Sequence, residues 1–132
     1  MTTTALEATE ALAASNAFHP RVTLESLEAS IAHRLFFTGE DALRAADEAH
    51  VSGLDGELAN LSVLTVCLLV MRNGFTIIGK SAPASAENFD AEKGRTFAYE
   101  DAIRQLWPLE GYVLRTMLRS AEIARETYEA LR

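Results

Sequence analysis

The sequence predicts an α+β fold in which one antiparallel β-hairpin packs against three main helices. Two apolar segments, Leu61–Val70 and Phe75–Lys80, are joined by Asn73-Gly74 and indicate the hairpin. Apolar residues that recur every three or four positions before and after the hairpin indicate the helices. With 132 residues, the chain is long enough to form one core.

The turn is the most specific local signal. Both central residues of a type I′ turn have positive φ, which Asn-Gly adopts most readily. Leu61–Val70 has almost no polar residue, as is typical of a strand buried on both faces. The second strand alternates between Phe75, Ile77, Gly79 and Thr76, Ile78, Lys80. Because two strands alone are not stable, we expect either helices on both faces or a homo-oligomer that extends the hairpin at its edge.

A helix is predicted to begin after Thr23, a favourable N-cap residue, and to end at Gly39. Its apolar face is formed by Leu24, Leu27, Ile31 and Leu35. In the acidic segment that follows, we expect a short helix over Asp41–His50 and a loop over Val51–Asn60.

Two further helices are predicted after the hairpin. The first begins near Asn88 or Phe89 and places Phe97, Ile103 and Leu106 along one face. Pro108 is predicted to end or kink this helix because proline has no backbone N–H. The last helix covers Leu109–Leu131 and carries a stripe of Val113, Met117, Ala121, Ala124, Tyr128 and Leu131.

Residues 1–18 are rich in Thr, Ala and Glu, and we expect them to form a mobile or partner-dependent arm in which a frayed helix can form. Residues 19–132 are expected to form a single α+β domain. The longest apolar run, Val63–Met71, is far shorter than the ~20 residues of a membrane-spanning helix, and no signal-peptide pattern is visible. We therefore expect a cytoplasmic protein with no membrane partner.

The charge balance argues against a nucleic-acid-binding protein. Twelve basic and nineteen acidic residues give a net charge of -7, whereas proteins that bind nucleic acids usually carry a basic stripe. Cys67 is the only cysteine and lies inside an apolar run. We interpret it as a small buried hydrophobic residue in a reducing compartment.

No enzyme or metal-site motif is present. His19, His33 and His50 lie on different segments, without the spacing of a metal site. Gly74–Ser81 has the Gly-x-x-x-x-Gly-Lys-Ser spacing of a phosphate-binding loop, but its central residues are the best strand residues of the chain and Pro83 follows. We expect no catalytic residue, no metal and no cofactor.

Cationic and aromatic residues after the turn are the candidates for a ligand site. The predicted site consists of Lys80, Arg95, Tyr99, Arg104, Trp107, Glu110 and Arg115. Cations beside aromatic rings can bind a phosphorylated or nucleotide-like molecule by ion pairing and stacking. The alternative is that these cations form surface ion pairs with Glu87, Glu92, Glu100 and Glu110.

Four sequence segments, HPRVT, LTVCLLVMRNGFTIIGKSA, ENFDAEKGR and AIRQLWPLEGY, lie between His19 and Tyr112. In these segments the chain resembles a family of small tailed-phage proteins named after gene product forty-nine of phage N-four and gene sixty-six of phage Sf-six. The resemblance covers roughly residues 19–118. It implies an accessory product that acts in the cytoplasm of the infected bacterial host, and it brings no catalytic residues.

These observations lead to one main hypothesis and two alternatives. The main hypothesis is a non-enzymatic anti-defence protein that sequesters a nucleotide-like small molecule. One alternative is an acidic protein–protein inhibitor of a host factor. The other is a structural or assembly modulator that acts through the exposed edge of the hairpin.

Overall fold

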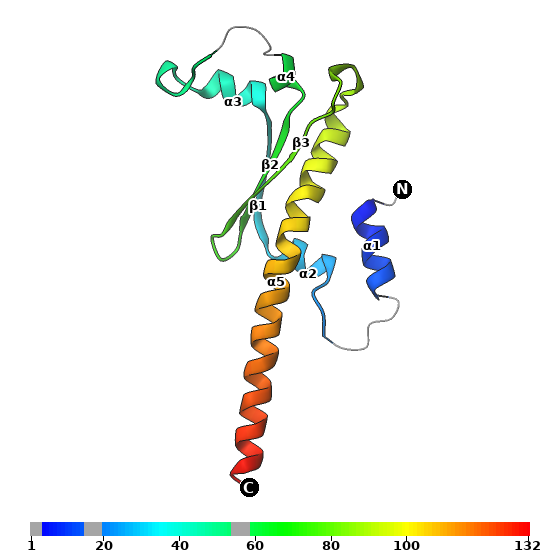
Figure 1. The fold of residues 1–132 in the computed structure, drawn as a ribbon, viewed down its shortest axis with the longest axis vertical. Coiled ribbons are helices and arrows are strands. Elements are labelled where there is room, and N and C mark those ends of the chain that lie inside the picture. The colour runs from blue at the N-terminus through cyan, green and yellow to red at the C-terminus, as the bar shows by residue number, and fades with distance from the viewer. Residues whose placement is uncertain (1–3, 15–19, 54–58) are drawn as a thin grey trace. The chain divides into compact units, whose positions relative to one another are not determined.

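A computed structural model describes residues 4–14, 20–53 and 59–132. The chain divides into two compact units, one formed by Ser30–Arg104 and the other by Met1–Ala29 together with Gln105–Arg132. The first unit contains an antiparallel sheet of three strands in the order β1-β2-β3 (Figure 1). The predicted α+β class is confirmed, but the sheet has one strand more than the predicted hairpin.

The additional strand, β1 (Ile31–Thr38), lies where the sequence predicts a helix. Helix α2 (Leu24–Ala29) begins where expected but ends before Ile31, so the predicted helix up to Gly39 is wrong. The apolar residues of this segment are also compatible with a strand, because Leu35 and Phe37 lie two residues apart. Pairing with β2 (Thr65–Met71), from Thr38 opposite Thr65 to Ile31 opposite Met71, decides in favour of the strand.

The predicted hairpin is confirmed, with β3 (Thr76–Ser81) as its second strand. The predicted type I′ turn is wrong: Gly74 has a φ of 90°, but no described residue other than glycine has positive φ. The N–H of Gly74 donates to the carbonyl of Met71 at 2.9 Å, and the N–H of Met71 donates to the carbonyl of Phe75 at 2.8 Å. The turn is therefore a three-residue loop with a left-handed glycine at its end. The Asn73 side chain stabilises it by accepting the N–H of Phe75 at 2.9 Å.

The connection from β1 to β2 is partly helical. Helix α3 (Gly39–Ala45) is capped by Thr38 and Asp41, each of whose side chains accepts the backbone N–H of the other residue. It corresponds to the short helix predicted over Asp41–His50, although its end is five residues earlier and a separate 3₁₀-helix, η1 (Glu48–His50), follows. Of the predicted loop, residues 54–58 lie outside the described part, and helix α4 (Ala59–Ser62) begins within it.

A 3₁₀-helix, η2 (Ala86–Asn88), connects β3 to α5 (Ala91–Ala130), one helix of 40 residues in place of the two that the sequence predicts. The sequence predicts that the helix ends or kinks at Pro108, but the helix does not end there, because α5 continues through this proline. Proline leaves the carbonyl of Arg104 without its helical donor. Since Arg104 and Pro108 are both exposed, water can hydrogen-bond that carbonyl instead.

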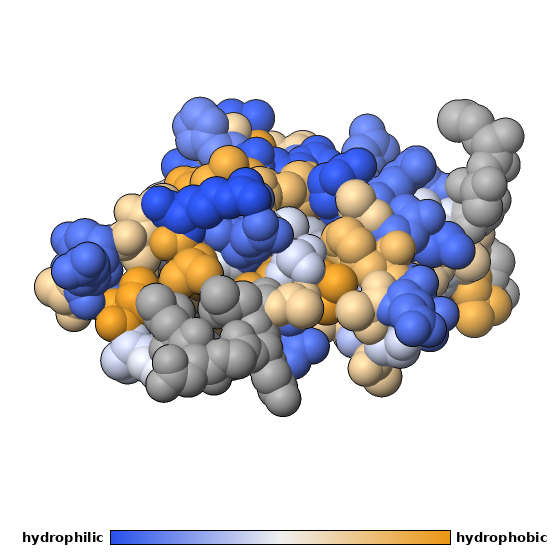
Figure 2. Space-filling view, turned by 90° about the horizontal axis from the view of Figure 1, so that it is seen from above, coloured by the Kyte–Doolittle hydropathy of each residue, from blue (hydrophilic) through white to orange (hydrophobic). Residues whose placement is uncertain are grey.

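The buried face of α5 differs in one residue from the predicted face. Ile103 and Leu106 are buried as expected, but Phe97 is 53% exposed. In the sheet unit, Ala98 and Ala102 are fully buried. The last part of α5 has a surface on which hydrophobic residues of the predicted stripe are exposed, including Val113, Met117 and Tyr128, and Leu131 just after the helix is exposed as well. Figure 2 shows hydrophobic residues at the surface between hydrophilic ones.

In the first half of α5, the helix backbone approaches β3 closely at Gly79. A Cβ atom at Gly79 would lie 2.1 Å from the carbonyl oxygen of Ala98 and 2.5 Å from the amide nitrogen of Ala102. The strand therefore needs a residue without a side chain at this point. Figure 1 shows α5 running alongside β3.

The second unit contains α1 (Ala5–Ala14) and α2. Glu10 of α1 pairs with Arg21 and accepts the backbone N–H of Leu24 at 2.8 Å. The hydrogen bond from Arg21 lowers the pKa of Glu10. Part of the predicted arm, residues 1–3 and 15–18, lies outside the described residues, and its mobility stays a prediction, as does the domain boundary at residue 19. Among the described helices, none is long and apolar enough to cross a membrane.

We predict that Gly79→Ala lowers the free energy of unfolding by about 3 kcal/mol or more, because the new methyl group would overlap the backbone of α5. Urea unfolding monitored by circular dichroism measures this change. Gly111→Ala is the control: its Cβ meets nothing within 4 Å, so alanine should raise the stability of this helical position by up to about 1 kcal/mol. Equal effects of the two substitutions would contradict the close packing at Gly79.

Candidate functional site

Three hydroxyl groups lie in a row across one end of the sheet. Thr38 pairs with Thr65, and Thr65 pairs with Ser81. Side chains of directly paired residues point to the same face. Thr65 is on the face that α5 covers, because a Cβ atom at Gly94 of α5 would lie 2.6 Å from its Oγ1 atom. The first turns of α5 therefore lie over this hydroxyl row.

Thr65 holds an unsatisfied polar atom. Its side chain is buried, and its Oγ1 atom has no hydrogen-bond partner among the described residues. By contrast, the hydroxyl of Thr38 accepts the N–H of Asp41 at 3.1 Å. An unsatisfied buried hydroxyl is uncommon and marks a place where a polar group of a ligand or a water molecule can bind.

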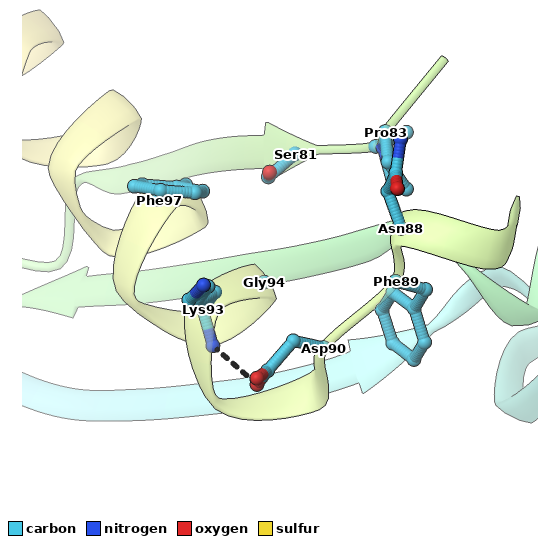
Figure 3. Close-up of a pocket in the computed structure, with 9 residues that line it drawn as sticks. Ser81, Pro83, Asn88, Phe89, Asp90, Lys93, Gly94 and Phe97 are labelled. Atoms are coloured by element: carbon cyan, nitrogen blue, oxygen red, sulfur yellow. Dashed lines mark hydrogen bonds between the residues drawn. The ribbon is translucent and has the colours of Figure 1, made fainter. Parts of the chain in front are cut away.

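A cavity of about 240 Å³ opens beside this row between β3 and the start of α5. Figure 3 shows Phe89 and Phe97 on opposite sides of it. Asp90 caps α5 at this point, accepting the N–H of Lys93 at 3.1 Å (Figure 3). The carboxylate already occupies the helix N-terminus and disfavours a second anion there. The lining is formed by Ser81, Ala82, Pro83, Asn88, Phe89, Asp90, Lys93, Gly94 and Phe97.

A second cavity, of about 120 Å³, lies near Thr65 and is lined in part by the cationic side chain of Arg95. Its lining is formed by Phe36, Phe37, Thr38, Asp41, Thr65, Phe89, Ala91 and Arg95. Phe89 lines both cavities. The Asp41 carboxylate accepts the backbone N–H of Thr38 at 2.9 Å, and this hydrogen bond lowers the pKa of Asp41. The second cavity thus combines aromatic rings with one anionic and one cationic group.

Of the predicted ligand site, Arg95 lines one of the two described cavities. Within the described part of the chain it has no ion pair. Two other predicted residues do: Arg104 lies 3.4 Å from Glu100, and Arg115 lies 2.8 Å from Glu122. The alternative of ion pairing thus describes Arg104, whose partner Glu100 was predicted but is buried. Arg115 is also paired, but with Glu122, which was not among the predicted partners, and Arg95 is not paired within the described residues.

Tyr99 lies one turn after Arg95 and takes part in a contact that was not predicted from the sequence. The guanidinium carbon of Arg34, on β1, lies 4.5 Å from the centroid of the Tyr99 ring, a cation–π geometry. Arg104 is nine residues beyond Arg95. At about 100° per residue it points to the opposite side of α5. Arg95 and Tyr99 can therefore contact one ligand, and Arg104 cannot join them.

The remaining predicted residues lie elsewhere. The exposed Lys80 is on β3, and its backbone N–H donates to Oδ2 of Asp101 at 2.9 Å. Trp107 and Glu110 are half-buried and Arg115 is exposed, all three in the other unit. Phe89, Asp41 and Thr65 were not predicted. Their neighbourhood depends on β1, which the sequence analysis interpreted as a helix.

A family model described as the phage protein (N4 Gp49/phage Sf6 gene 66) family matches residues 22–118. The match includes the strands β1, β2 and β3 and the lining of both described cavities. It ends within α5, so the last residues of this helix lie outside it. No curated protein and no solved structure matches the chain.

We predict that Thr65→Val raises the free energy of unfolding by about 1 kcal/mol, because valine keeps the shape of threonine and removes an unsatisfied buried hydroxyl. Thr38→Val is the matched control and should lower it by about 1 kcal/mol, since that hydroxyl caps α3. Chemical denaturation of both variants measures the difference. A loss of stability in Thr65→Val would show that the hydroxyl is hydrogen-bonded in solution.

We predict that Cys67 makes the protein less stable at alkaline pH. Burial raises the pKa of its thiol from 9.0 to about 11. Above about pH 9 the unfolded chain loses the thiol proton while the folded chain retains it, so stability falls as the pH rises toward about 11, by at most about 1.4 kcal/mol per pH unit. Urea unfolding across this range should show a shallower fall for Cys67→Ala. The same slope in both proteins would contradict the shift.

Proposed function

The chain belongs to the N4 Gp49/phage Sf6 gene 66 family of phage proteins, and we propose that it is a non-enzymatic anti-defence protein that sequesters a nucleotide-like small molecule. As a phage accessory protein, it would act in the cytoplasm of the infected host. The binding site proposed is the sheet end around Phe89, with Arg95 as its cation.

The observation that carries this proposal is the environment of Arg95. Its guanidinium has no ion pair within the described residues, and it lines a cavity together with Phe36, Phe37 and Phe89. A guanidinium binds phosphate and carboxylate oxygens through paired hydrogen bonds, and aromatic rings stack on planar bases. A nucleotide-like molecule offers both groups, which supports this ligand class.

The size of the cavities determines how such a ligand would bind. Volumes of about 240 Å³ and 120 Å³ are below the roughly 300–1,000 Å³ of sites that enclose a drug-sized ligand. A bound nucleotide would therefore remain partly exposed. Its affinity would depend more on the charge of Arg95 than on enclosure, and it should weaken as the salt concentration rises.

Binding without catalysis is supported by the positions of the described histidines. His33 lies on β1 and lines neither of the two described cavities, and His50 is an exposed residue of η1 that contacts Asp47. A nucleophile–base pair would require a hydrogen bond between a histidine and a nucleophilic side chain. Among the described residues, neither histidine makes such a hydrogen bond. The inhibitor of a host factor and the assembly modulator stay as alternative predictions.

We predict that a nucleotide-like ligand raises the thermal midpoint of the wild-type protein and that Arg95→Ala abolishes this shift. A ligand at a hundred times its dissociation constant adds about 2.7 kcal/mol, which corresponds to a shift of several degrees in a domain of this size. The measurement is thermal unfolding against mono-, di- and cyclic nucleotides and ADP-ribose derivatives. Arg104→Ala, which removes an arginine paired with Glu100, is the matched control and should keep the shift.

Two results would contradict the proposal. If no compound of the panel shifts the wild-type midpoint, the small-molecule function is wrong and a host protein becomes the leading partner. If a compound shifts the wild type and Arg95→Ala equally, the ligand binds, but not at this site.

A further inference from the structure

The central strand has apolar side chains on both faces, but the described residues of the sheet unit cover only one of them. On the face toward α5, Cys67, Leu69 and Met71 are buried. On the other face, Val66, Leu68 and Val70 are only half-buried. A strand that is apolar on both sides is typical of a sheet with both faces covered. Within the described residues of the sheet unit, a layer is therefore missing on one side of β2.

We define the open face as the side chains that share the uncovered side of the sheet. The register places Leu35 and Ile78 on either side of Leu68 in its middle row, and these two flanking residues are 54% and 59% exposed. The outer rows are His33, Val70, Thr76 and Phe37, Val66, Lys80. The middle row is entirely apolar, and the polar side chains are confined to the outer rows.

The edges of the sheet are less available than its open face. On β3, the N–H of Lys80 is already accepted by the Asp101 carboxylate. On β1, the pairing with β2 is irregular between Ile31 and His33. Such covering and bulging of edge strands are features that hinder the addition of another strand. Packing of another layer on the open face is the remaining way to bury it.

We propose that the open face is the contact surface between two copies of this chain. Each chain carries a net charge of -7, so two copies repel each other over most of their surface. The open face carries none of the nineteen acidic residues, and its titratable side chains are His33 and Lys80. It is therefore a surface on which two such acidic chains can approach.

The pattern of the open face also fits twofold symmetry. A twofold contact brings the same surface of each copy together, so the surface must be complementary to itself. An apolar middle row with polar side chains on the outer rows meets this requirement, because apolar residues meet near the axis and polar residues lie at the rim. Two sheets packed in this way would form a sandwich with an α5 helix on each outer side.

The area of the open face indicates a weak dimer. Three strands spaced about 4.8 Å apart, each contributing about five residues of roughly 3.4 Å, give a face of roughly 250 Å². Stable complexes bury about 800 Å² on each partner. The dimer should therefore depend on protein concentration and should be strengthened by salt, which screens the repulsion between two acidic chains.

Sedimentation velocity over a range of concentrations and salt tests this proposal. The wild-type mass should rise from 14.4 kDa toward twice that value with concentration. Ile78→Glu and Leu35→Glu place charges in the middle row and should each keep the protein monomeric. Phe75→Glu is the matched control, because Phe75 is 53% exposed but lies in the turn, outside the open face. It should dimerise like the wild type.

Circular dichroism tests whether each variant is folded. If a glutamate variant is unfolded, Ile78→Thr is measured in its place, because threonine suits an exposed strand position. A wild type that stays at 14.4 kDa at every concentration and salt overturns the proposal. So does a dimer that both open-face variants retain. If Met117→Glu, on the exposed part of α5, abolishes the dimer and the open-face variants do not, the helix is the contact surface instead.

Discussion

The close packing of α5 on β3 at Gly79 is the contact on which the rest of the sheet unit depends. Because a strand glycine faces the backbone at Ala98 and Ala102, helix and strand approach each other more closely than side chains would permit. This contact fixes where the start of α5 lies over the sheet. It also determines which face of the sheet is covered and which is left open.

The candidate site is a consequence of the same packing. One turn before Ala98, Gly94 leaves room for the Thr65 hydroxyl, so the helix passes directly over the hydroxyl row. Phe89, just before the helix begins, lines both the cavity beside β3 and the cavity near Thr65. Arg95 follows Gly94 and reaches the cavity near Thr65. Small residues on the helix thus bring an aromatic ring, a cation and an unsatisfied hydroxyl together.

Whether a feature could be predicted depends on how far apart along the sequence the residues that determine it lie. The hairpin was predictable because Asn73 and Gly74 lie directly between the two strands that they join. The ion pair of Arg104 with Glu100 was predictable for the same reason, because the two residues are one helical turn apart. Strand β1 was not, because its partner β2 lies about thirty residues later and the spacing of Ile31 and Leu35 fits a helix as well. Features that depend on β1, such as the cation–π contact of Arg34, were missed with it.

The alternation of side chains along β2 places Arg95 and the middle row of the proposed dimer contact on opposite sides of the sheet. Thr65 points toward α5 and the cavities, whereas its neighbour Val66 belongs to the open face. A charge placed on the open face is therefore on the opposite side of the sheet from Arg95. The two surfaces share one side chain, Phe37, which lines the second cavity and belongs to an outer row of the open face. The middle row of the open face shares none with the cavities, so a substitution there that prevents dimerisation should leave ligand binding measurable. A middle-row variant that loses both has lost the sheet itself.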